Sequence, residues 1–179
     1  ISEEKLWANL EYFLKAVVPV CEEHGIKIGL HPDDPPLKKL GNVSRILVSK
    51  ENIQKAIDLV PSPNLGITMC QANYLAMGEN VYECIEYFGR QNKIFFVHFR
   101  DIAGTLESFH ETFHDNGPTD MVKALKCYRD VGFDGPIRVD HVPTMAGEVN
   151  GRPGYESLGR LYAIGYLRGI AEAIGYPLT

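Results

Sequence analysis

Each of four side chains able to bind a metal ion directly follows an apolar segment of the chain. The pairs are Ile26–Leu30 with His31, Leu65–Met69 with Cys70, Lys93–Val97 with His98, and Pro136–Val139 with Asp140. Taken singly, each has an ordinary explanation: a lone cysteine is a small buried hydrophobe, a lone histidine a satisfied polar group, and an aspartate a loop cap. Because the carboxyl ends of parallel strands share one sheet edge, the four together favour a metal site.

Two imidazoles, a thiolate and a carboxylate form a donor set of mixed softness. Such a set suits Zn²⁺, Fe²⁺, Co²⁺ or Mn²⁺, whereas Ca²⁺ and Mg²⁺ prefer oxygen ligands. Ligands from separate strands would be preorganised, which favours catalysis over a structural role. The expected ion would bind substrate oxygens and acidify a neighbouring C–H or hydroxyl group.

Two further residues are acid–base candidates. His141 follows Asp140 directly and either exchanges protons or only orients that carboxylate. Tyr155 closes the glycine-rich loop 151–155 and is either part of an active-site flap or a surface aromatic residue.

Candidate substrate-binding residues lie mainly in the polar connection after the third apolar segment. Arg100, His110 and His114 belong to this connection, and such loops often bind substrates. His110 and His114 have the i, i+4 spacing of a helical metal pair, but the segment has little helical pattern and ends in Asn116–Gly117, which disfavours a second metal site. Arg45 could bind a carboxylate, or it could be a solvated loop residue.

The apolar segments alternate with amphipathic ones, and this order predicts the elements that position these residues. Short apolar runs predict buried strands, and apolar residues at helical spacing predict helices. An additional short extended piece is expected at Ile46–Val48. The pattern shows no tight hairpins, so we expect a parallel sheet. The helices are expected from Ser2 to Gly25 and near Lys50–Leu59, Asn80–Phe88, Asp120–Val131 and Glu156–Ile174.

This alternation fits two α/β architectures. A doubly wound nucleotide-binding sheet is disfavoured, since neither GxGxxG nor GxxxxGK[ST] occurs. A (β/α)₈ TIM barrel requires eight strands and roughly 250 residues, and the pattern supplies half the strands. Because the chain starts with Ile1, we expect a single domain over 1–179 that is the C-terminal half of such a barrel, with the N-terminal half absent. A self-associating half-barrel is the alternative.

Composition excludes several classes of function. The chain has 179 residues, 45% of them hydrophobic and 23% charged, as in globular domains. A net charge of −5 without a basic run argues against nucleic-acid binding. The apolar runs are too short to span a membrane, and the start does not resemble a signal peptide. The 4 cysteines are far apart, which indicates reduced thiols and a cytoplasmic location.

A set of motifs extends over nearly the whole chain: Ile1–Glu4, His31–Pro36, Cys70, Phe96–Arg100, Phe109–Glu111, His114, Asn116–Gly117, Asp120–Met121, Asp140–His141 and Arg152–Tyr155. Together they resemble the C-terminal half of mannonate dehydratase, a family of xylose-isomerase-like TIM barrels. The resemblance covers nearly the whole chain. It implies that His31, Cys70, His98 and Asp140 are the metal ligands and that Tyr155 and His141 are the acid–base residues.

The resemblance further implies a hydro-lyase of hexuronate catabolism that converts D-mannonate to 2-keto-3-deoxy-D-gluconate with Mn²⁺ or Fe²⁺, as a homodimer. After His141 some family members read Gly-His, but this chain reads Val142–Pro143, so a related sugar acid is an alternative substrate. A divalent-metal sugar isomerase or epimerase is a rival, although Cys70 counts against it. A non-catalytic scaffold with a vestigial site is the other rival.

Overall fold

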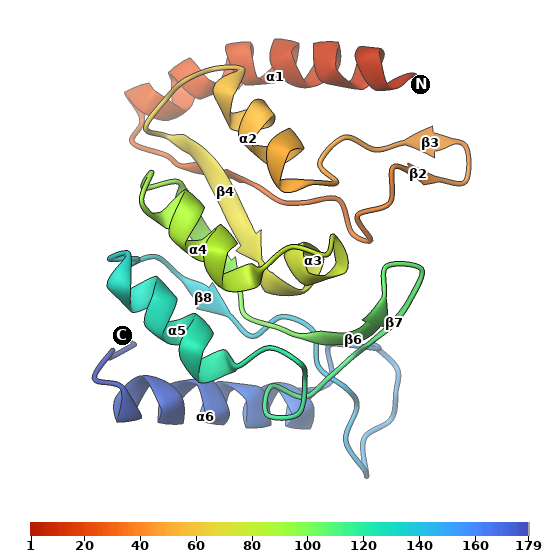
Figure 1. Cartoon of the computed structure of the whole chain (residues 1–179), viewed down its shortest axis with the longest axis vertical. Coiled ribbons are helices and arrows are strands. Elements are labelled where there is room, and N and C mark those ends of the chain that lie inside the picture. The colour runs from red at the N-terminus through yellow and green to blue at the C-terminus, as the bar shows by residue number, and fades with distance from the viewer. Residues whose placement is uncertain (179) are drawn as a thin grey trace.

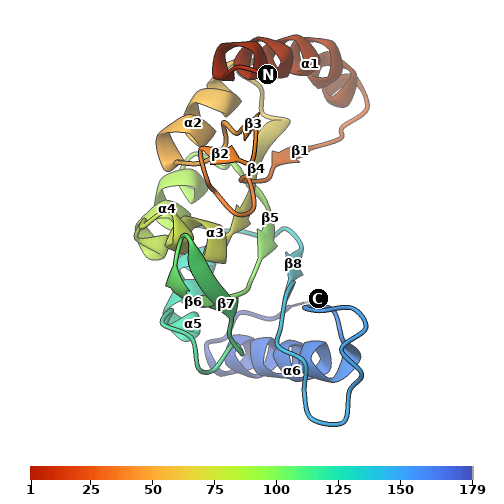
Figure 2. The same cartoon turned by 90° about the vertical axis from the view of Figure 1, so that its right-hand side faces the viewer.

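The centre of the fold is a parallel sheet of 4 strands in the order β1-β4-β5-β8 (Figure 1 and Figure 2). The computed structural model describes residues 1–178. Every strand pair in this sheet is parallel, as the sequence pattern predicted. All residues of β4, which pairs with β1 on one side and β5 on the other, are buried. The strands are β1 (Ile28–Leu30), β4 (Leu65–Cys70), β5 (Ile94–His98) and β8 (Ile137–Arg138).

Helices run along one side of this sheet, from α1 at one end to α6 at the other (Figure 2). Three residues at the start of expected helices are N-caps in the structure: Ser2, Asn80 and Asp120 each accept a backbone N–H from the first turn. Within residues 1–178, no helix covers the opposite face of the sheet (Figure 2). The helices on the covered side are α1 (Glu3–Glu23), α2 (Lys50–Asp58), α4 (Val81–Gly89), α5 (Met121–Asp130) and α6 (Ser157–Ala173).

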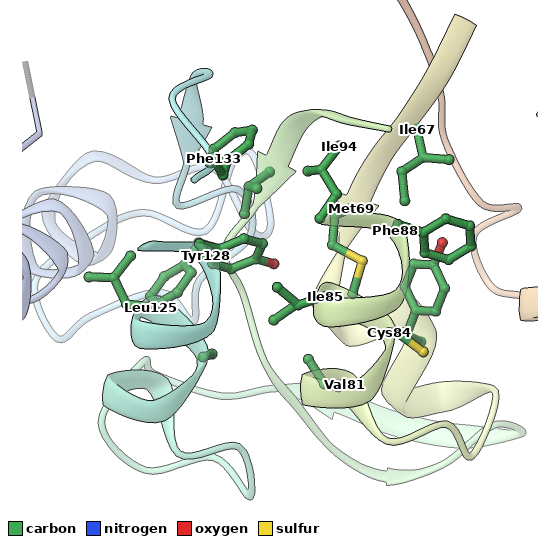
Figure 3. Close-up of a cluster of buried hydrophobic side chains, with 14 of the residues drawn as sticks. Ile67, Met69, Val81, Cys84, Ile85, Phe88, Ile94, Leu125, Tyr128 and Phe133 are labelled. Atoms are coloured by element: carbon green, nitrogen blue, oxygen red, sulfur yellow. The ribbon is translucent and has the colours of Figure 1, made fainter. Parts of the chain in front are cut away.

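A hydrophobic core fills the space between the sheet and helices α4 and α5 (Figure 3). Met69 of β4 packs there with Ile85 and Phe88 of α4 and with Tyr128 of α5, and all of these side chains are fully buried. Such a close-packed layer resists deformation. The carboxyl ends of β4 and β5 are therefore held on a rigid support.

The prediction that the chain lacks tight hairpins was wrong. Two antiparallel hairpins extend from the ends of β1 and β5. They are too short and too mixed in polarity to show a clear alternating pattern. The hairpin strands are β2 (Lys39–Leu40) with β3 (Val43–Ser44), and β6 (Ile102–Thr105) with β7 (Ser108–Glu111).

Two local differences from the predicted elements bear on the site. The segment Ile46–Val48 is not a strand, because its amides bond to a side chain instead: Ile46 N–H and Leu47 N–H donate to the Asp33 carboxylate at 3.1 and 2.9 Å. A short helix not predicted from the sequence, α3 (Gln71–Ala76), begins directly after Cys70. Neither α3 nor any other helix in residues 1–178 is long and apolar enough to cross a membrane.

Candidate active site

Three of the predicted metal ligands meet at the carboxyl edge of the sheet. His31 follows β1, Cys70 ends β4, and His98 ends β5, where it is the register partner of Cys70. The donor atoms of these three side chains all lie within 4.8 Å of one another. His31 Nε2 and His98 Nδ1 are 3.0 Å apart. The structure thus brings together groups that are far apart in the sequence.

The fourth predicted ligand, Asp140, adjoins this group. Its Oδ2 lies 3.4 Å from His98 Nδ1. The backbone of Asp140 is in the left-handed region, at φ 55°, which is unfavourable for a residue other than glycine. Strained residues of this kind concentrate at functional sites, where the surrounding fold holds them in place. Here that backbone conformation directs a buried carboxylate towards the histidines.

The donor set of these residues fits a first-row divalent metal ion. It consists of imidazole nitrogens, a cysteine sulfur and a carboxylate oxygen. His31 Nδ1 lies 2.6 Å from the carbonyl oxygen of Pro32. Donation of Nδ1–H to that carbonyl leaves the Nε2 lone pair facing the other ligands, which is the usual arrangement of a metal-binding histidine.

Arg100 lies beneath this group with only 2% of its surface exposed. Its Nη2 donates to Asp34 Oδ2 at 2.6 Å and to Asn73 Oδ1 at 2.8 Å, and its Nε lies 3.2 Å from Asp140 Oδ2. Its Nε also donates to Cys70 Sγ at 3.4 Å. The guanidinium is therefore occupied by protein groups, and contact with a substrate stays a prediction.

The charge of Arg100 is maintained despite its burial. Burial alone would lower the pKa of this guanidinium, but the nearby Cys70, Glu111 and Asp34 raise the pKa by more than burial lowers it. A permanent positive charge thus lies between the candidate metal ligands and the acidic residues around them.

The two predicted acid–base residues are in direct contact. His141 Nε2 lies 2.5 Å from the hydroxyl oxygen of Tyr155, and the two rings meet edge to face. The loop that carries Tyr155 is tied back to the sheet, since Val142 N–H donates to the carbonyl of Gly154 at 3.1 Å. His141 Nε2 is 3.8 Å from Asp140 Oδ1, so the pair adjoins the candidate metal ligands.

The remaining predicted site residues are placed differently. Arg45 donates to Asp33 Oδ1 at 3.0 Å and to the carbonyl of Asp34 at 3.1 Å, and so holds the loop that follows β1. His110 is exposed on β7. His114 is buried beside the Phe99 ring, and its Nε2 bonds to the carbonyl of Phe99. Burial lowers the pKa of His114. The structure does not bring these three into the cluster around Cys70, and substrate binding by them stays a prediction.

Sequence reasoning missed two polar residues of the cluster. Asn73, on α3, accepts a hydrogen bond from the Cys70 thiol at 3.1 Å and donates to the carbonyl of Asp33 at 2.8 Å. Glu111, at the end of β7, accepts hydrogen bonds from Arg100 and lies 3.1 Å from His141 Nδ1. Alternation along β7 would have separated Glu111 from the exposed His110, but only once this strand had been recognised.

Comparisons with solved structures identify the fold. The chain matches mannonate dehydratase from Streptococcus suis serotype 2 with a TM-score of 0.88 and 35% identity, covering 100% of this chain and 53% of that one. A D-tagatose 3-epimerase-like protein matches with a TM-score of 0.70 and 21% identity, over 94% of this chain and 55% of that chain. The fold is a partial (β/α) barrel of the xylose-isomerase-like class, as predicted.

Sequence comparisons identify the family of the chain within this class of barrels. The family model of D-mannonate dehydratase (UxuA) matches residues 1–177. Mannonate dehydratase 2 from Halalkalibacterium halodurans is 46% identical over 178 residues, which are 97% of this chain and 51% of that protein. The chain belongs to the mannonate dehydratase family, and it spans about half the length of the curated relatives it matches.

Proposed function

We propose that the intact protein containing this chain removes water from D-mannonate to give 2-keto-3-deoxy-D-gluconate, with the help of a divalent metal ion. Family membership over residues 1–177 supports the reaction class. The observation that carries the proposal is the convergence of His31, Cys70 and His98 at one strand edge, beside the contact between His141 and Tyr155.

The metal ligands in this proposal are His31, Cys70, His98 and Asp140. Mn²⁺ or Fe²⁺ is the proposed ion, and the same donors would accept Zn²⁺ or Co²⁺. The bound ion would supply positive charge beside the substrate's carboxylate and C2 hydroxyl, which makes the C2 proton easier to remove.

His141 and Tyr155 carry out the proton transfers in this proposal. Dehydration breaks the C2–H bond and the C3–O bond, and the C3 hydroxyl leaves as water once it has gained a proton. The enol that forms between C2 and C3 then becomes the 2-keto group. At 2.5 Å the imidazole and the phenol are within hydrogen-bonding distance, so one can accept the C2 proton while the other protonates the leaving hydroxyl. The loop 151–155 holds Tyr155 over the site.

An assay of the purified intact protein with Mn²⁺ and mannonate tests this function. We expect a 2-keto-3-deoxy acid as the product, and metal analysis should find bound metal that is lost in C70S and H98A. Matched controls are C127S and H24A, which change residues outside the cluster. Metal-loaded protein that forms no keto-deoxy product from mannonate would contradict the proposal.

The same assay distinguishes the rival functions. A ketose formed from an aldose would indicate an isomerase, and an epimerised sugar would fit the fold shared with the D-tagatose 3-epimerase-like protein. A keto-deoxy product from another sugar acid would identify a dehydratase of different specificity. Unchanged metal content in C70S and H98A would favour a scaffold with a vestigial site.

The proposal also covers the cellular location, the domain organisation and the assembly of the protein. We place it in the cytoplasm, which is supported by the 4 cysteines of the sequence all being free thiols in the structure. Residues 1–179 form one domain that is half of a barrel, and the other strands come from outside this segment. A homodimer is the proposed assembly, and light scattering of the intact protein would test it.

A further inference from the structure

Glu111 lies next to the acid–base candidates His141 and Tyr155, but the proposed proton transfers give it no role. It ends β7, and Ile102 is its register partner in the hairpin. This register places Glu111 beside the segment that starts with Arg100 and Asp101. The hairpin thus places the Glu111 carboxylate next to His141, although Glu111 is far from Tyr155 in the sequence.

The contacts of Glu111 link two parts of the site. Its Oε1 accepts a hydrogen bond from Arg100 Nη1 and lies 3.1 Å from His141 Nδ1. On the other side of the imidazole, His141 Nε2 lies 2.5 Å from the Tyr155 hydroxyl. Glu111, His141 and Tyr155 therefore form one continuous chain of polar contacts.

The donors and acceptors in this chain determine where the imidazole proton lies. A carboxylate only accepts hydrogen bonds, so a close contact with His141 Nδ1 requires an N–H at that nitrogen. Arg100 Nη1 also lies 3.0 Å from Nδ1 and would require a lone pair there instead. Nη1 carries two N–H groups, so its donation to Glu111 does not by itself exclude this second contact. A lone pair on Nδ1 would, however, face the negatively charged Oε1 of Glu111 at 3.1 Å, and two acceptors repel each other, so we assign the proton to Nδ1.

We propose that Glu111 is a positioning residue, which holds His141 with its proton on Nδ1 so that the Nε2 lone pair faces the Tyr155 hydroxyl. In this arrangement His141 accepts the hydrogen bond of the phenol. The tyrosine is then the group whose proton passes to the imidazole during the reaction. The catalytic consequence rests on the proposed dehydratase function, whereas the tautomer does not.

The second oxygen of Glu111 supports a role beyond structure. Oε2 is buried and accepts no hydrogen bond from the described residues. A carboxylate that served only to hold the hairpin would be expected to use both oxygens, because a buried polar atom without a partner is costly. A buried oxygen without a partner lowers stability, so its presence beside His141 fits a role of Glu111 at the site.

Nitrogen-15 NMR of labelled histidine in the intact protein tests the tautomer directly. The protein is loaded with Zn²⁺, which is diamagnetic, and the His141 signals are assigned by their loss in H141Q. We expect wild-type His141 to be protonated at Nδ1 and unprotonated at Nε2. In E111Q this preference should be lost, while E111D, which retains the charge, should restore it in part. A proton on Nε2 in the wild type would overturn the proposal, even if E111Q failed to fold.

Kinetics provide the second measurement. E111Q should lower kcat by roughly 10- to 100-fold, a part of what acid–base groups contribute, with little change in KM or metal content. E107Q is the matched control, since Glu107 is exposed at the turn of the same hairpin. An E111Q variant with wild-type kcat and wild-type His141 spectra would refute the role. If the wild type does not dehydrate mannonate, the proposed function fails, yet the spectra still decide on Glu111.

Discussion

Among single residues, Asn73 connects the candidate metal ligands to the loop after β1. Its Oδ1 accepts hydrogen bonds from Cys70 Sγ at 3.1 Å and Arg100 Nη2 at 2.8 Å, and its amide donates to the carbonyl of Asp33. N73A would leave the buried Arg100 Nη2 and the Asp33 carbonyl without this partner. It would thereby loosen the guanidinium that donates to the Cys70 sulfur.

We therefore expect N73A to weaken Mn²⁺ binding by roughly 10- to 100-fold, the usual effect of losing a group that orients a ligand. The free energy of unfolding should fall by about 1–3 kcal/mol. Metal titration and chemical denaturation measure the two effects, with the exposed Asn42 changed to alanine as the control. Equal metal affinity in N73A and N42A would show that Asn73 does not orient the site.

His114 makes stability depend on pH. Burial lowers its pKa below the ordinary 6.5, so the unfolded chain binds this proton more readily than the folded one. The stability contributed by neutral His114 is complete above about pH 6.5 and is lost as the pH falls through the lowered pKa. In H114Q, which can still donate to the carbonyl of Phe99, the loss of unfolding free energy between about pH 7.5 and about pH 5.5 should be smaller than in the wild type. Identical losses would mean that His114 is not the responsible group.

At the scale of elements, the buried carboxylate of Asp101 holds the loop that follows β7, and this loop in turn fixes the position of Glu111. Asp101 Oδ2 accepts the N–H of Thr119 at 2.7 Å, and the Asp101 carbonyl accepts the N–H of Thr112 at 3.1 Å. Gly117 lies against this arrangement so closely that a Cβ there would be 2.5 Å from Thr112 Oγ1 and would collide with the Asp101 carboxylate. The hairpin that carries Glu111 therefore depends on a position without a side chain.

G117A should displace this loop and lower the unfolding free energy by about 1–3 kcal/mol, as overpacking does. It should also lower kcat, because Glu111 and His141 would separate. G165A is the matched control: nothing lies within 4 Å of a Cβ at Gly165 in α6, so the protein should gain stability of up to about 1 kcal/mol. Thermal unfolding and steady-state kinetics compare the two variants. A G117A protein as stable as G165A would contradict this account of the loop.

The same elements show what the sequence could predict. Short apolar runs bounded by glycine, proline or polar residues located the strands of the parallel sheet, and the metal-binding residue type after each run was visible in the sequence. The hydrogen-bond partners of Arg100 could not be predicted from the sequence. Asp34, Asn73 and Glu111 come from separate loops and short elements far apart along the chain. Arg100 is buried and its guanidinium contacts protein groups, which the sequence did not indicate, while its contact with a substrate stays a prediction.

For the whole molecule, the sheet has two outer strands. Within residues 1–178, β1 pairs only with β4, and β8 pairs only with β5. A closed (β/α)₈ barrel has no outer strands, since each strand pairs on both sides. If the intact protein closes such a barrel, the free backbone groups of β1 and β8 must pair with strands from outside this segment.

Hydrogen exchange of residues 1–179 expressed alone, compared with the intact protein, tests this closure. The amides of β4 and β5 should be similarly protected in both samples, because their neighbours on both sides are present in the segment. The amides of β1 and β8 should exchange much faster in the isolated segment, since opening there breaks fewer contacts. Concentration-independent exchange would exclude pairing between two copies. Equal protection of β1 and β8 at every concentration would show that the segment satisfies its own edges, and the half-barrel account would then be wrong.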